Sequence, residues 1–65
     1  MTGAEARDAM LSQSPVTYNG IQYKYISAII YRSDKNGNLM ISAELLDKNK
    51  NSVTIVRLQD VSLLS

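Results

Sequence analysis

The pattern of apolar and polar positions changes character at Pro15. Before it, small apolar residues recur at helical spacing on one face of the chain. Thr2 and Glu5 have the spacing of a capping box, in which each side chain accepts the backbone N–H of the other at a helix start. The residue before a proline is disfavoured in helical geometry. The pattern therefore predicts a helix from Gly3 to about Ser12.

After Pro15 the apolar residues alternate with a period of two, which is typical of strands. Asn19-Gly20 is a strong hairpin signal, because both residues tolerate the positive φ angles of a type I′ turn. A two-residue turn at this point fixes the register of the hairpin. It pairs Tyr18 with Ile21, and Val16 with Tyr23.

The strand that leaves this turn, residues 21–32, is long, and its alternation slips after Tyr25. A slip of this kind predicts a bulge or sharp bend, so that the strand contributes to two sides of a barrel. Further alternating segments are residues 39–45, 53–58 and 61–64, with a short kink at Gln59-Asp60. We therefore expect one mainly β domain over residues 1–65: a helix over about 3–12, then five strands over about 16–64 in a small closed barrel.

Residues 34–44, "DKNGNLMISAE", place acidic and amide oxygens at alternate positions, as a calcium loop does. In an EF-hand the sixth position is glycine and the twelfth is a bidentate glutamate. Counted from Asp34, these positions are Leu39 and Leu45, and Glu44 falls one place short. Asp, Asn and Gly are also the residues that hairpin loops prefer. We interpret the segment as a turn followed by a strand and expect no metal site.

The order of elements resembles that of the Sm-like and Hfq-like small β-barrels. The matching pieces are "YNGIQYKY", the Asp-containing loop before "LMISAELLD", and "VRLQDVS". The last piece is similar to the second Sm signature, an aliphatic residue, Arg-Gly-Asn, any residue, then an aliphatic residue. Val56, Arg57, Gln59 and Val61 fit or nearly fit it, with Leu58 in the place of the glycine. SH3-like barrels share this strand order and are the alternative.

The resemblance implies a ring in which Arg57 packs against a bound base and Gln59 lies beside it as an amide donor and acceptor. The asparagine of the first Sm signature has Ser42 as its nearest counterpart here. The lysine-histidine pair of the bacterial members is missing, because the chain has no histidine. The sequence is also similar in character to short reading frames of bacterial viruses and prophages.

Composition argues against catalysis. The chain lacks histidine and cysteine, the commonest general base and the best thiol nucleophile. Its aspartates are spread over a helix and separate turns, and no carboxylate pair is evident. We expect no enzyme activity and no cofactor.

Charge and length limit the partners. Seven basic and six acidic residues give a net charge of +1, far from that of a protein that neutralises many phosphates. No apolar run approaches the ~18 residues that span a bilayer, and the N-terminus lacks the pattern of a signal peptide. We expect a cytoplasmic protein without a membrane partner, in the host cytoplasm if it is viral.

The four tyrosines are the only aromatic residues and lie close together in the sequence. They are either stacking platforms for bases, with nearby cations on phosphate, or packing residues of a barrel. Arg57 shares a strand face with apolar residues, so it either extends to the rim or meets an anion. The candidate ligand-binding residues are Arg57, Gln59, Tyr23, Tyr25, Lys24 and Arg32.

Large apolar residues exceed what so small a barrel can bury, and a surplus of this kind usually marks an interface. The surplus residues are Met40, Leu46, Leu58, Leu63 and Leu64. We therefore expect a homo-oligomer, a ring or dimer, that binds a small anionic nucleotide or short oligonucleotide. A viral sponge for cyclic nucleotide signals of bacterial defence is one version. The alternatives are an Sm-like RNA-binding protein and a protein-interaction module or inhibitor of a host enzyme without a small ligand.

Overall fold

The computed structural model, which describes residues 1–64, begins with the expected helix, α1 (Gly3–Ser12). The capping box is present: the Glu5 N–H donates to Thr2 Oγ1 over 3.1 Å, and the Thr2 N–H donates to Glu5 Oε1 over 2.8 Å. The helix ends where Gln13 adopts left-handed geometry, with φ of 55°. The predicted bounds of the helix are confirmed.

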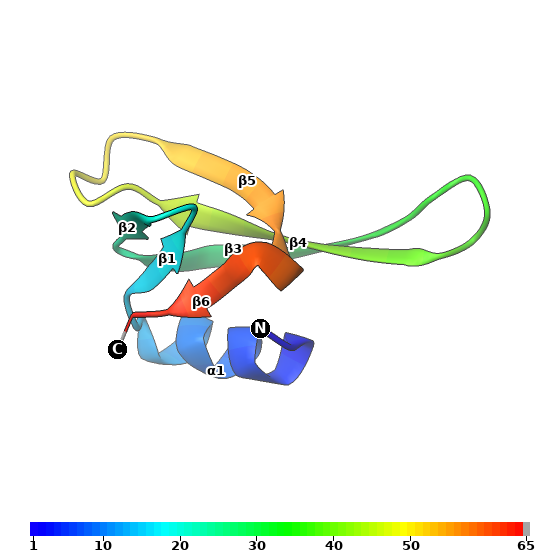
Figure 1. The fold of residues 1–65 in the computed structure, drawn as a ribbon, viewed down its shortest axis with the longest axis horizontal. Coiled ribbons are helices and arrows are strands. Elements are labelled where there is room, and N and C mark those ends of the chain that lie inside the picture. The colour runs from blue at the N-terminus through cyan, green and yellow to red at the C-terminus, as the bar shows by residue number, and fades with distance from the viewer. Residues whose placement is uncertain (65) are drawn as a thin grey trace.

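Six strands follow and form two antiparallel three-stranded sheets (Figure 1). The strands are β1 (Val16–Tyr18), β2 (Ile21–Tyr23), β3 (Tyr25–Ser33), β4 (Leu39–Leu46), β5 (Val53–Arg57) and β6 (Val61–Leu63). One sheet has the order β2-β1-β6, and the other has the order β3-β4-β5. A 3₁₀ turn, η1 (Leu58–Asp60), lies at the predicted kink and connects β5 to β6.

The β1–β2 hairpin has the predicted turn and register. Asn19 and Gly20 have φ angles of 52° and 77°, as a type I′ turn requires. The observed pairs include Tyr18 with Ile21 and Val16 with Tyr23. Both expectations are confirmed, because the turn chemistry of two residues is enough to set this register.

The long second strand is bent, as its interrupted alternation predicts. It divides at Lys24 into β2 and β3, which belong to different sheets. The Lys24 N–H donates to the Leu46 carbonyl over 2.8 Å, which ties the bend to the end of β4. The register between β3 and β4 also shifts between Ile26 and Ala28. One strand therefore contributes to both layers of the domain.

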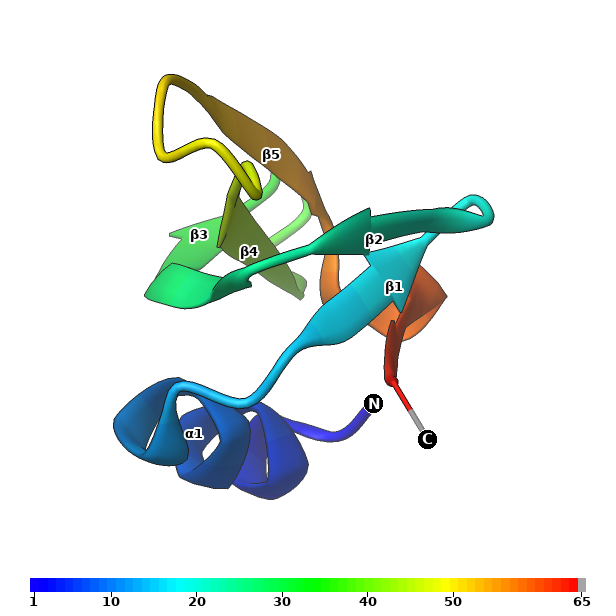
Figure 2. The ribbon, with the colours of Figure 1, turned by 90° about the vertical axis from the view of Figure 1, so that its left-hand side faces the viewer.

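The expected closed barrel is wrong: the domain is mainly β, but its two sheets are not hydrogen-bonded into a cylinder. Only the bend at Lys24 and the turn η1 carry the chain from one sheet to the other. Closure needs strands long enough to keep pairing around the circumference, whereas β1, β2 and β6 have three residues each. Helix α1 contacts β3. It lies along the side of the domain that is formed by β3, an edge strand of one sheet, and β6, an edge strand of the other (Figure 2).

The core lies between the two sheets and the helix. Nine apolar residues are buried: Ala6, Ala9, Val16, Ile26, Ala43, Leu45, Val56, Leu58 and Val61. The fully buried residues of the helix are both alanines, which allow its backbone to approach the sheets closely, and Met10 packs against the core from a half-buried position. Leu58, expected among the surplus residues, is 3% exposed and belongs to the core, so that expectation is wrong. The turn η1 directs it inward.

The hairpin of β3 and β4 extends beyond the core as an arm (Figure 1), and the molecule measures 37 × 22 × 20 Å. Tyr31 and Leu39 lie on this arm and are 58% and 65% exposed. Across residues 1–64, no helix has the length and apolar character that a membrane crossing requires.

Leu45 and Leu39 provide a matched test of the core, because they lie on the same strand with exposures of 0% and 65%. We expect Leu45→Ala to lower the free energy of unfolding by about 2–5 kcal/mol, as the loss of a buried leucine does. Leu39→Ala should change it by less than about 0.5 kcal/mol. Urea denaturation followed by circular dichroism measures both values. Equal losses in the two variants would contradict the core described above.

Candidate functional site

A cavity forms where β5 leaves its sheet. The pairing of β4 with β5 ends at Ser42 and Arg57, so residues 39–41 of β4 pair with β3 alone. The chain then turns away through η1 toward the first sheet. The space left beside β4 is a cavity of about 310 Å³ that also reaches the start of α1. We call it the Arg57 cavity.

The Arg57 cavity combines an apolar part with polar groups. Leu39, Ile41 and Leu58 provide large apolar side chains. The polar residues that line it are Thr2, Ser42, Arg57 and Gln59. Small-molecule sites in proteins have this composition, mostly apolar with a few convergent polar groups, and start at ~300 Å³. The cavity is large enough for one compact ligand.

Arg57 and Gln59, the two residues that the Sm-like resemblance nominates, lie together in this cavity with Ser42. Ser42 and Arg57 are direct cross-strand partners. The contribution of Thr2 and Gly3 was not anticipated. No local signal in the sequence could have indicated it, because it depends on how the helix packs against the sheets.

The charges around the cavity are mixed. The Arg57 side chain is exposed and cationic, and the first turn of α1 has a partial positive charge. Glu5 partly offsets that charge: its carboxylate accepts the Thr2 N–H, which lowers the pKa of Glu5 below its usual value. A guanidinium near a helix start favours an anion with planar or tetrahedral oxygens.

The remaining candidates lie elsewhere. Tyr23, Lys24 and Tyr25 line a second depression, together with Lys48. Arg32 is exposed on the arm, where it pairs with Met40, and lines neither cavity. The structure thus separates the nominated residues into two groups and leaves Arg32 apart.

The tyrosines differ in their surroundings. Tyr18 and Tyr23 are half-buried and pack against the core. Part of each side chain therefore serves as packing, and the rest is accessible. Tyr25 is also half-buried, and Tyr31 is mainly exposed. Lys48 and Lys50 lie in the turn between β4 and β5 and are exposed.

The loop at residues 34–38 is a hairpin turn, as predicted. The Asp34 carboxylate accepts the N–H groups of Asn36 and Asn38 over 2.8 and 2.9 Å. Gly37 has φ of 81°, which its lack of a side chain allows. Within residues 1–64, no three histidine, cysteine or acidic side chains are grouped as metal ligands.

A scan against protein-family models, a search of curated proteins and a search of solved structures each found no match to this chain. The class that the fold defines is therefore a small, mainly β domain with an N-terminal helix and two three-stranded sheets.

The Asp34 turn predicts a local pH response. The N–H groups of Asn38 and Asn36 hold the pKa of Asp34 below its ordinary value of 3.8. A carboxyl whose pKa is depressed by folding stabilises the folded state above its unfolded pKa, and this contribution is lost as the pH falls through the folded pKa. We therefore expect a carbon-13 titration midpoint below 3.8 for Asp34.

The protection of the Asn36 and Asn38 amides from exchange, taken relative to the rate of an unstructured amide at the same pH, should fall once Asp34 is protonated. Asp34→Asn removes the titrating group, so this loss of protection with falling pH should be absent from that variant. A midpoint at or above 3.8 in the wild-type protein would contradict the carboxylate-centred turn.

Proposed function

We propose that this protein is a non-catalytic binding protein for a small anionic ligand of the nucleotide type, and that it works as a homo-oligomer. The observation that supports the ligand class is the convergence of Arg57, Gln59 and Ser42 in one cavity beside the start of α1. An arginine offers a planar fork of donors that matches phosphate oxygens. An amide and a hydroxyl next to it can donate to and accept from the same ligand.

The apolar part of the Arg57 cavity suits the rest of a nucleotide. Leu39 and Ile41 of β4 line the cavity and offer apolar surface to a base. A volume of about 310 Å³ fits a single nucleotide unit better than a folded nucleic acid. The net charge of +1 also favours a ligand with one or two phosphates over a polymer.

Apolar exposure supports self-association. Eight large apolar side chains are exposed: Leu11, Ile21, Tyr31, Leu39, Val53, Ile55, Leu63 and Leu64. Leu63 and Leu64, expected as surplus, are 50% and 41% exposed. The accessible surface of 4453 Å² exceeds the roughly 4,100 Å² that size scaling gives for a compact monomer of 7.2 kDa. Association would cover part of this surface.

The outward face of β5 is the strongest candidate for that contact. Val53, Ile55 and Arg57 alternate on it, and the two apolar side chains are 48% and 54% exposed. β5 is also an edge strand, so one of its backbone edges has no partner in the sheet. Exposed apolar edge strands readily pair with another chain.

Arg57→Ala tests the ligand, with Arg32→Ala as the matched control, because Arg32 is an exposed arginine outside the cavity. Charged hydrogen bonds contribute ~1.5–3 kcal/mol, so we expect Arg57→Ala to weaken nucleotide binding by about tenfold or more. Arg32→Ala should bind as the wild type does. The amide shifts of residues 42 and 57–59, followed during titration of the nitrogen-15-labelled protein with adenosine monophosphate, cyclic adenosine monophosphate or a cyclic dinucleotide, supply the affinities of this cavity. Unchanged affinity in Arg57→Ala would exclude this cavity as the site.

Native mass spectrometry and light scattering test the oligomer. We expect a mass that is a multiple of 7.2 kDa at micromolar concentration. Ile55→Asp should shift the population toward the monomer, because it places a charge in the proposed contact. Leu11→Asp is the control, since Leu11 is an exposed leucine on the helix. A folded wild-type protein that stays at 7.2 kDa would refute self-association. The ligand proposal would not be affected, because the arginine variants test it separately.

A further inference from the structure

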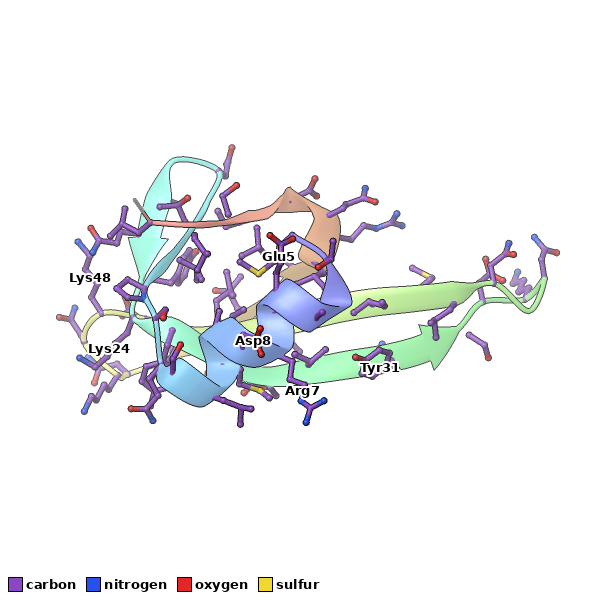
Figure 3. The ribbon with its side chains drawn as sticks, turned by 90° about the horizontal axis from the view of Figure 1, so that it is seen from below. Glu5, Arg7, Asp8, Lys24, Tyr31 and Lys48 are labelled. Atoms are coloured by element: carbon purple, nitrogen blue, oxygen red, sulfur yellow. The ribbon has the colours of Figure 1, made fainter. Side chains whose placement is uncertain are left out.

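A second depression, separate from the Arg57 cavity, lies at the end of the molecule opposite to the tip of the arm. It has a volume of about 530 Å³, and its side chains include two lysines, two tyrosines and two glutamines. Figure 3 shows Lys24 and Lys48 at this end of the molecule. We call it the Lys24 depression. It shares no lining residue with the Arg57 cavity.

The bend in the second strand creates this depression. In a straight strand, successive side chains point to opposite faces. Here Gln22, Tyr23, Lys24 and Tyr25 all line one depression, because the chain changes direction at Lys24. The hydrogen bond from the Lys24 N–H to the Leu46 carbonyl holds the bend against the end of β4.

The same hydrogen bond brings a distant lysine close. Directly after Leu46 the chain enters a tight turn, in which the Asp47 N–H donates to the Ser52 carbonyl and the Lys50 N–H donates to the Asp47 carbonyl. Lys48 projects from this turn and lines the depression. Two lysines from separate elements thus line one space.

The groups that border the depression define the chemistry of its ligand. Among the residues that the structure describes, no carboxylate lines it, so neither lysine is neutralised from within the site. Two ammonium groups suit a phosphate dianion. Half-buried tyrosine rings offer a surface for stacking a flat aromatic group, and the amides of Gln13 and Gln22 can donate to or accept from that group.

We propose that the Lys24 depression binds a phosphate monoester of an aromatic group, with the phosphate between Lys24 and Lys48 and the ring against Tyr25. This site does not depend on the function proposed for the Arg57 cavity. Together the two sites give the protein an anion-binding position at each end of the core.

Titration of the nitrogen-15-labelled protein with adenosine 5′-monophosphate tests the proposal. We expect shifts at the amides of residues 22–25 and 48, which form a group separate from any shifts at residues 39–42 and 57–59 of the Arg57 cavity. Adenosine alone and inorganic phosphate alone should each bind at least about tenfold more weakly, because each lacks one half of the recognised group. A parallel titration with O-phosphotyrosine distinguishes two classes of ligand. Binding as tight as that of the nucleotide assigns the site to aromatic phosphates in general. Weaker binding assigns it to nucleotides.

Matched variants separate this site from general charge effects. Lys24→Ala and Lys48→Ala should each weaken binding by about threefold to fivefold, as exposed charge pairs do. Lys35→Ala, an exposed lysine in the distant loop, should have no effect. Tyr25→Leu should weaken binding, whereas Tyr25→Phe and Tyr31→Leu should not. The backbone amide spectrum of each variant verifies its fold.

The Arg57→Ala variant tests the Lys24 depression separately from the ligand site proposed for the Arg57 cavity. Shifts at residues 22–25 and 48 should persist in that variant. Their absence from the wild-type protein at millimolar nucleotide, or an equal loss in Lys35→Ala and Lys48→Ala, would overturn the assignment. Inorganic phosphate that binds as tightly as the nucleotide would overturn the aromatic part of it.

Discussion

The domain depends on one bend, where the Lys24 N–H donates to the Leu46 carbonyl and a single strand passes from one sheet to the other. The first sheet consists of three strands of three residues and could not be stable alone. The bend lays it against the second sheet, so that Val16 and Val61 share a core with Ile26 and Leu45. Without this change of direction neither sheet would have a covered face.

So small a core has consequences for the surface. The buried residues of the helix are Ala6 and Ala9, and no strand supplies more than two buried side chains. The remaining apolar residues, including Val53 and Ile55 on the edge strand β5, stay exposed. A chain without cysteine cannot add a disulfide to compensate. Self-association, as proposed above, would cover part of this surface.

Both cavities lie where the chain departs from a sheet. The Arg57 cavity forms where β5 stops pairing with β4, and the Lys24 depression forms at the bend between β2 and β3. At such points a strand separates from the strand that it was paired with. Its consecutive side chains, which would point to opposite faces of a regular sheet, then line the same cavity. One corner therefore presents Arg57 from β5, and the other presents Lys24 from the bend and Lys48 from the turn between β4 and β5.

By itself the sequence determined the local structure of this protein: the helix and its capping box, the Asn19-Gly20 turn with its register, the bend, and the Asp34 turn. Each depends on residues a few positions apart, whose conformational preferences act directly on one another. Only the tertiary structure decided that the barrel stays open, that Leu58 is core, and that the candidate binding residues fall into two groups. These outcomes depend on strand lengths and on contacts between segments far apart in the chain, as between Lys24 and Lys48, and no short pattern encodes such distances.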